Sequence, residues 1–417
     1  MPRTSITVRS RIRNTVILRK EYGWDGKITK TAVPELDAVY LNENKSPHSH
    51  AEFCLCLYDV DVMDVIGRVQ LDVQRSKLME TKERVNTNRN QFLDFLKGLG
   101  CIGVVFIHIR FPGVMGQVIS KVSQFAVPVF FMITGYYALE CPHTIIKRRL
   151  IKTLGIFFYG YFFFLIYSIA FALKNGVLVD WLKANYTWKA LVKSVFFCTI
   201  DFAIPLWYLI AMLETYILWY FAVKSKRQKQ LVDMMPMLFA LQIVLTVVCE
   251  TNDFAWFWKI NFLTQALPWF LFGYYVHGHE KEEIWMKRHG KVLAVCAAVG
   301  CIAAIVPVVL DMPFDFSCIG ILFYSASLFL IAVYYYDMPI YEPIAYIGNK
   351  LSRNVYIFHV LVAGGLSFGF HHILNIDVEG DFFKWTKPIM TVAATIILSW
   401  MIYSVSLYLQ KHNVLKI

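Results

Sequence analysis

The stretch Phe92-Leu-Asp-Phe-Leu-Lys-Gly-Leu-Gly-Cys-Ile-Gly-Val-Val-Phe-Ile-His-Ile109 is an apolar run that keeps two further ionisable side chains beside its aspartate, Lys97 and His108. Burying an ionisable group in a bilayer is costly, so a span that retains such groups indicates a pathway or a reaction rather than simple anchoring. Eleven helical steps of about 1.5 Å separate Lys97 from His108 by roughly 16 Å, about half of a hydrocarbon core. The two groups are therefore predicted at different depths.

The composition indicates a polytopic membrane protein. Of the 417 residues, 57% are hydrophobic and 17% are charged, and the mean hydropathy is +0.49, which is too apolar for a soluble core of ordinary proportions. The hydropathy pattern predicts an all-α bundle of about ten transmembrane helices. The ten apolar runs lie near residues 92–111, 117–139, 150–173, 203–223, 233–251, 255–277, 291–310, 316–336, 353–374 and 387–409.

The charges of the loops predict the orientation of the bundle. Basic and acidic loops alternate along the chain, so by the positive-inside bias both termini are predicted to face the cytoplasm, in a multi-pass protein of the cell membrane. The net charge of +11 then reflects topology and contact with anionic lipid, and gives no reason to expect a nucleic-acid partner. The basic loops contain Lys147, Arg148, Arg149 and Lys152, then Lys224, Lys226, Arg227 and Lys229, and then Lys281, Lys287, Arg288 and Lys291.

The first ninety residues differ from the rest of the chain. They are mixed in charge and contain no apolar span and no signal-peptide pattern. Two interpretations are open for residues 1–90: a cytoplasmic segment with little structure, or a misassigned start for which Met79 is the working initiator. The integral membrane domain is expected over residues 91–417. The nine cysteines have no spacing typical of a zinc site or a disulfide framework, so no metal is expected.

The second and third runs each contain a feature that adds to the polar groups of the first run. In the second run, Pro128 and Gly135 interrupt a continuous helix pattern, and a freed backbone group in lipid needs protein or water to satisfy it, which predicts an interior position. The third run begins with Arg148, Arg149 and Lys152, of which two can lie a helical turn apart and bind phosphate oxygens. Anchoring by the positive-inside bias is the alternative explanation for this set.

Later spans also carry polar groups. The fourth run opens with Pro205-Leu-Trp-Tyr-Leu209 and continues to Glu214, which is either the structural partner of a cation or a member of a site. The ninth span carries Tyr356 and His359. An isolated histidine on an apolar face is more often a hydrogen-bonded packing residue, and His359 gains interest because the first span is also polar.

Taken in order, these motifs resemble the membrane-bound acyltransferase-3 family, over about residues 88–410. Members of this family include bacterial O-acetyltransferases of surface polysaccharides. The basic residue, ten intervening residues and histidine of the family fall on Lys97 and His108; lysine stands where many relatives carry arginine, and Thr134 stands where serine is common. The matching stretches are Leu93-Asp-Phe-Leu-Lys-Gly-Leu-Gly100, His108, Val127-Pro-Val-Phe-Phe-Met-Ile-Thr-Gly-Tyr136, Leu206-Trp-Tyr-Leu209, Leu267-Pro-Trp-Phe-Leu-Phe-Gly273 and Tyr356–His359.

The resemblance implies transfer of an acyl group, acetyl by default, from cytoplasmic acyl-CoA to a hydroxyl of a cell-surface glycan or its lipid-linked precursor. His108 would act as general base or as transient acyl carrier, since a neutral imidazole suits both roles. Lys97 would stabilise phosphate or an oxyanion, with Asp94 as its candidate partner. Acyl-CoA would be a co-substrate, with no permanently bound cofactor. Donor-binding candidates are Arg148, Arg149, Lys152 and Trp207, and further site candidates are Glu214, Tyr356 and His359.

Structural roles and another function class stay open at this point. Lys97 is only five residues into its span, so it could extend to the cytoplasmic headgroups, and His108 could be a packing residue near the outer interface. A transporter of a small metabolite or of a lipid-linked sugar also fits spans with buried charges. Consumption of the acyl-CoA thioester separates the two classes, because a carrier leaves the thioester intact.

Overall fold

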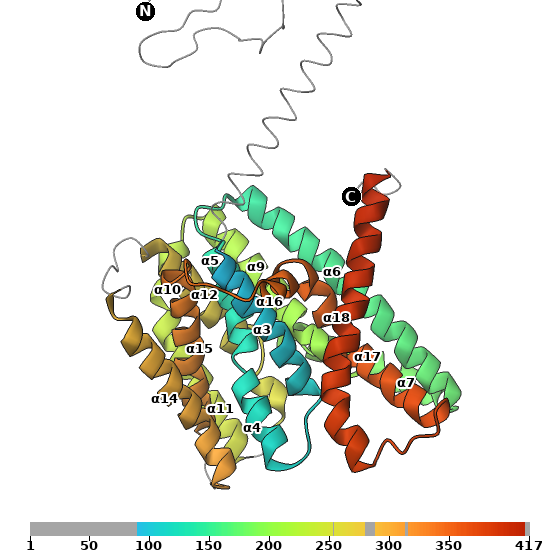
Figure 1. Cartoon of the computed structure of the whole chain (residues 1–417). Coiled ribbons are helices and arrows are strands. Elements are labelled where there is room, and N and C mark those ends of the chain that lie inside the picture. Colours follow the sequence, from blue (N-terminus) through green and yellow to red (C-terminus); the bar gives the residue numbers. More distant parts are fainter. Residues whose placement is uncertain (1–89, 253, 280–287, 313–315, 413–417) are drawn as a thin grey trace, which may run out of the picture. The chain divides into compact units, whose positions relative to one another are not determined.

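The computed structural model describes residues 90–252, 254–279, 288–312 and 316–412. Contacts divide the chain into two units, Met1–Arg89 and Asn90–Ile417. The predictions for the first unit, including the alternative start at Met79, lie outside the described residues. Within the described part of the second unit, all regular elements are helices and no strand is found, which confirms the predicted all-α class (Figure 1).

The helices follow one another along the chain with short connections. In order they are α3 (Gln91–His108), α4 (Gly113–Ser123), α5 (Ala126–Tyr136), α6 (His143–Lys174), α7 (Leu178–Asn185), α8 (Trp188–Phe197), η2 (Asp201–Leu206), α9 (Trp207–Lys224), α10 (Gln228–Asp233), α11 (Met235–Thr251), η3 (Trp256–Trp258), η4 (Phe262–Ala266), α12 (Leu267–His279), α14 (Gly290–Val309), α15 (Ser317–Tyr334), α16 (Glu342–Tyr346), η5 (Ile347–Leu351), α17 (Ser352–His372) and α18 (Asp381–Lys411).

In the described residues, nine helical stretches are long and apolar enough to cross a membrane. They correspond to nine of the ten predicted runs. The run near 255–277 is instead divided into η3, the π-helix η4 and the 13-residue α12. The physical cause is a capping box: the Asn261 side chain accepts hydrogen bonds from the backbone N–H groups of Leu263 and Thr264, and the Thr264 hydroxyl accepts one from the Asn261 N–H. A new helix therefore begins inside the apolar run.

The helices begin and end at the two ends of the bundle in the order that the predicted spans require. The beginning of α6 and the end of α18 lie at the same end of the bundle, the top in Figure 1, whereas α4 and α7 lie at the opposite end. Helix α3 runs from the first end towards the second, so Lys97 lies nearer the beginning of α6 and His108 lies at the far end of α3. The cytoplasmic location of both termini stays a prediction.

Close backbone approaches fix α3 among its neighbours. A Cβ placed on Gly98 would lie 2.0 Å from the carbonyl oxygen of Ile344, and one placed on Gly348 would lie 1.9 Å from the carbonyl oxygen of Asp94. Only glycine at these positions allows α3 to pack so closely on α16 and η5, as small residues do at helix interfaces in membranes. Elements α4, α5, α15, α17 and α18 also contact α3.

The stretch around Pro128 and Gly135 lies in the interior, as predicted. Most residues of α5 are buried, including Pro128 and Gly135. The helix is interrupted at Gln124 and Phe125, between α4 and α5. Pro128 therefore lies in the first turn of α5, where its missing N–H costs no intrahelical hydrogen bond. Gly135 lies against the carbonyl of Phe270 in α12 at a distance that excludes any larger residue.

Candidate active site

Two cavities are lined by polar side chains of α3, one by His108 and the other by Lys97. The first, here called the His108 cavity, has a volume of about 440 Å³ and is lined by His108 together with residues of α4, α5, η2, α9, α11, η3, η4, α12, α15 and α17. The second, the Lys97 cavity, has a volume of about 190 Å³. Its lining consists of Lys97, Phe130, Thr134, Thr153, Ile156, Tyr208, Leu209, Met212, Tyr216, Ser352, Arg353 and Tyr356.

His108 and His359 lie side by side. Their ring centroids are 5.1 Å apart and the ring planes are inclined by 45°. His359 is fully buried in α17, whereas His108 is exposed at the end of α3 and lines the cavity. The tertiary structure therefore brings together two histidines that are separated by about 250 positions in the chain.

The hydrogen bonding of His359 assigns its tautomer. Its Nδ1 lies 3.1 Å from the carbonyl oxygen of Val355, and a carbonyl oxygen can only accept a hydrogen bond, so Nδ1 carries the proton in the neutral ring. The other nitrogen, Nε2, then carries a lone pair. This atom is buried and has no hydrogen-bond partner among the described residues. His359 thus offers a desolvated acceptor next to His108.

The Lys97 cavity is cationic. Lys97 of α3 and Arg353 of α17 both line it, along with the hydroxyl-bearing residues Thr134 and Ser352. A further cation is close, because Arg149 of α6 makes a side-chain hydrogen bond to Tyr216, which is also a lining residue. This concentration of positive charge with hydroxyl donors suits phosphate oxygens.

An aromatic wall separates the two cavities. Phe130, Tyr208 and Tyr356 line both. The ring centroids of Tyr208 lie 6.1 Å from Phe130 and 5.3 Å from Tyr356. The Tyr356 hydroxyl donates a hydrogen bond to the carbonyl oxygen of Pro205, which ties α17 to η2. Lys97 and His108 therefore lie on the two sides of a shared wall of three side chains.

The comparisons with known proteins identify the family. The sequence profile of the acyltransferase domain matches residues 90–404, from the N-cap of α3 to within α18. The chain belongs to the acyltransferase 3 family. Comparison with curated proteins and with solved structures gave no match. The matched residues include both cavities and the wall between them, so the described site belongs to a membrane acyltransferase.

In this acyltransferase, only part of the predicted donor-binding set lies near the Lys97 cavity. Arg149 contacts the Lys97 cavity through Tyr216, while Arg148 and Lys152 are exposed on α6. Trp207, predicted with this set, is buried and lines the His108 cavity. Tyr356 and His359, named as further candidates, lie in the wall and beside His108.

Two predicted residues line neither of the two cavities of this acyltransferase. Asp94 is buried on α3, one helical turn before Lys97. Glu214 lies in α9, where its Oε2 accepts a hydrogen bond of 3.2 Å from the Cys198 thiol. The partner is a thiol and not the cation that the structural interpretation of Glu214 predicted.

The sequence did not single out several cavity residues of the acyltransferase. Arg353 lies three residues before Tyr356, at the start of the ninth predicted span, and was not among the predicted site residues. Gln242, Lys259 and Trp269 all line the His108 cavity and come from three separate segments. Signals for these residues were available: Gln242 is the single amide of the run near 233–251 and Lys259 is a cation inside the run near 255–277, and such groups are costly in a span. Trp269 belongs to the matching stretch Leu267–Gly273.

Proposed function

We propose that this acyltransferase moves a short acyl group, acetyl in the default case, from acyl-CoA at the cytoplasmic face to a hydroxyl at the other face. The acceptor would be a cell-surface glycan or its lipid-linked precursor. The observation that carries the proposal is the pair of cavities on α3, one cationic and one with an imidazole, which share a wall of three aromatic residues. Such an arrangement suits a donor and an acceptor that arrive from opposite ends.

The donor phosphates would be held by the cations of the Lys97 cavity, with Lys97, Arg353 and Arg149 as the residues involved. Of the two roles considered for Lys97, the spacing supports phosphate binding. Lys97 and His108 are separated along α3 by roughly 16 Å, which exceeds the reach of one lysine side chain, so an oxyanion formed at His108 would lie too far away. The pantetheine arm would pass between Phe130, Tyr208 and Tyr356 towards His108.

Two chemical routes fit His108. As general base, it takes the proton of the acceptor hydroxyl while the oxygen attacks the thioester carbonyl; the C–S bond breaks and the coenzyme A thiolate takes up the proton. As acyl carrier, the imidazole nitrogen attacks the thioester first and the C–S bond breaks, so coenzyme A leaves as a thiolate. The acceptor oxygen then attacks the acyl-imidazolium, the C–N bond breaks, and the hydroxyl proton passes to the thiolate. Both routes convert acyl-CoA and an alcohol into an ester and free coenzyme A.

His359 supports either route as a positioning residue. Its Nε2 is an acceptor beside the His108 ring, so it can receive the N–H of His108 and hold that ring with its other nitrogen towards the cavity. An acceptor at this place also stabilises the imidazolium that forms when His108 takes up a proton. This arrangement resembles the way a third group orients the base in other acyl-transfer sites.

The deciding experiment measures acetyl-CoA consumption by the purified full chain in lipid nanodiscs, with a glycan-bearing membrane extract as acceptor. His108→Ala is expected to lower the rate of coenzyme A release by about 10³-fold, in the range of general-base catalysis. The matched control is His371→Ala, an exposed histidine that lines neither cavity. Equal turnover by the His108 variant and the control, at equal amounts of folded protein, would contradict the proposal.

The same assay addresses the transporter alternative. A carrier without acyl chemistry leaves the thioester intact in every variant. Labelled acetyl groups are then followed by mass spectrometry of the extract. A gain of one acetyl mass on a glycan hydroxyl, lost in His108→Ala, is the expected result.

A further inference from the structure

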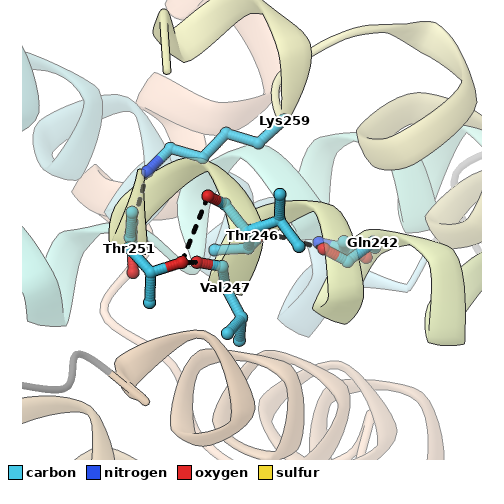
Figure 2. A network of polar contacts seen from close by, with 7 residues as sticks. Gln242, Thr246, Val247, Thr251 and Lys259 are labelled. Carbon is cyan, nitrogen blue, oxygen red and sulfur yellow. Dashed lines mark hydrogen bonds and ion pairs between the residues drawn. The ribbon is translucent and has the colours of Figure 1, made fainter. Parts of the chain in front are cut away.

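The His108 cavity has a second, polar region formed by residues far from His108 in the chain. Gln242 and Thr246 of α11, Lys259 directly after η3, Gln265 of η4 and Trp269 of α12 all line it. Figure 2 shows Gln242, Thr246 and Thr251 along α11, with the Lys259 side chain running past the end of this helix. The five lining residues Gln242, Thr246, Lys259, Gln265 and Trp269 are here called the amide region. The transfer chemistry proposed above does not use them.

Two buried polar atoms of the amide region lack a hydrogen-bond partner among the described residues. They are Oε1 of Gln242, which accepts hydrogen bonds, and Nε1 of Trp269, which donates them. The Thr246 hydroxyl does not satisfy the Gln242 side chain, because it donates to the Gln242 backbone carbonyl at 2.7 Å. Buried polar groups without partners are costly, and a ligand that pairs with them recovers this cost.

The polarity of the two atoms identifies the kind of ligand group. A hydroxyl donates one hydrogen bond and accepts others, so neighbouring hydroxyls can serve both a carbonyl oxygen and an indole N–H. A carboxylate can only accept and an ammonium can only donate, so neither satisfies the pair. A compound that carries several hydroxyls is therefore favoured over a simple ion.

Charged groups complete the amide region. Lys259 Nζ lies 2.7 Å from Oε1 of Glu250, and their side chains are 21% and 27% exposed. Both residues line the cavity. Since the ion pair is partly exposed, it presents donors and acceptors for further hydroxyls and adds no net charge to the amide region. Two cations outside this set, Arg110 and Lys121, also line the cavity.

We propose that the amide region is a saccharide subsite, in which hydroxyls of the acceptor sugar pair with Gln242 and Trp269 while the hydroxyl to be acylated lies at His108. This inference rests on the proposed function for the acyl-transfer step, and it assigns the acceptor a sugar with several free hydroxyls. Binding of the sugar in the amide region would set the distance between the sugar ring and His108, and this distance would select the hydroxyl that reacts.

The test uses Gln242→Met and Trp269→Phe in the full chain in nanodiscs. Gln242→Met removes the amide and keeps a side chain of similar length, whereas Trp269→Phe removes the indole nitrogen together with one ring. The matched control is Trp219→Phe, because the Trp219 indole nitrogen is also buried without a partner among the described residues, but Trp219 does not line the cavity. The probes are methyl glycosides of glucose, galactose, mannose and N-acetylglucosamine, with tetrahydropyran-2-methanol as a ring that carries a single hydroxyl.

Binding is measured by isothermal titration calorimetry without acetyl-CoA, and transfer by coenzyme A release with it. We expect at least one glycoside to bind the wild type, and Gln242→Met and Trp269→Phe each to raise its Kd and its KM about five- to tenfold. The KM for acetyl-CoA stays unchanged, Trp219→Phe behaves as wild type, and tetrahydropyran-2-methanol is insensitive to all three changes. If one variant fails to fold, judged by size-exclusion chromatography, the other decides.

Two outcomes overturn the subsite: no glycoside binds the wild type, or glycoside binding changes no more in the two variants than in Trp219→Phe. The second result assigns the unpaired atoms to bound water alone. Failure of the proposed function is a separate result, namely wild-type protein that binds a glycoside but leaves acetyl-CoA intact with every acceptor. Calorimetry therefore judges the subsite independently of turnover.

Discussion

The Lys97 cavity and the His108 cavity lie along the same helix but differ in size and in chemistry. The first has about 190 Å³ and is lined by the cations Lys97 and Arg353. The second has about 440 Å³ and is lined by an imidazole, amides, the Lys259–Glu250 ion pair and two further cations, Arg110 and Lys121. The smaller cavity, with cations and hydroxyl donors, suits the narrow, phosphate-bearing donor, and the larger, with an imidazole and amides, suits a compound that carries hydroxyls. One helix with two polar ends can thus keep two substrates apart until the acyl group is transferred.

The difference has a consequence for kinetics. A change in one cavity should affect the KM of one substrate, a change at His108 or His359 should affect turnover, and a change in the shared wall should affect both substrates. The predictions below test this division, and the removal of His108 itself, described above, has the largest expected effect.

The largest of the remaining effects is expected for His359→Ala. Loss of the acceptor beside His108 should lower kcat by about 10²-fold, because a misoriented base loses most of its advantage. Both KM values should stay within about twofold. The measurement is steady-state coenzyme A release, and His359→Gln, which keeps a hydrogen-bonding side chain, should restore part of kcat. A change in KM with unaltered kcat would assign His359 to binding instead.

A smaller effect is expected for Lys97→Met in the other cavity. Removing one charged hydrogen-bond donor from the phosphate site should raise the KM for acetyl-CoA about tenfold or more. The KM for the acceptor and the apparent Kd of the glycoside probe should not change. Lys97→Arg keeps the charge and serves as the matched control. Equal shifts for donor and acceptor would show that the two cavities are not separate in function.

The smallest effect is expected for Tyr356→Phe in the wall. The change removes the hydrogen bond to the Pro205 carbonyl, which should cost about 1 kcal/mol of stability. It should lower turnover about threefold and shift both KM values modestly, since Tyr356 lines both cavities. Thermal unfolding followed by tryptophan fluorescence, together with steady-state kinetics, checks this. A shift confined to one substrate would place Tyr356 with that cavity alone.

The sequence was sufficient wherever a local property decides the outcome. Lys97 and His108 stood out because ionisable groups are rare in apolar runs. The interior position of the Pro128 segment was also predicted, but for another reason than the one that holds: Pro128 lies in the first turn of α5 and frees no intrahelical hydrogen bond, and Gly135 is interior because it packs against the Phe270 carbonyl. The run at 255–277 shows the limit of hydropathy. Its apolar content predicted one continuous span, but the Asn261 capping box begins a new helix within it.

The grouping of residues was harder to predict. Trp207 was assigned to the donor side with the cations of the third run, yet it lines the cavity of His108. The reason is that η2, directly before α9, is held to α17 through Tyr356 and Pro205, a contact between residues 151 positions apart. No pattern within the fourth run contains this information.

By itself, the sequence determined the class of the protein, most of its spans, its family and the identity of the polar groups in the first helix, because each depends on composition or on motifs along the chain. Only the tertiary structure decided that Lys97 and His108 lie in different cavities, that His359 lies beside His108, and that Gln242 and Trp269 share a cavity with His108. Which face each helix turns towards its neighbours is set by contacts such as Gly98 with Ile344 and Gly135 with Phe270. These contacts join residues that lie far apart in the chain, so local patterns cannot specify them.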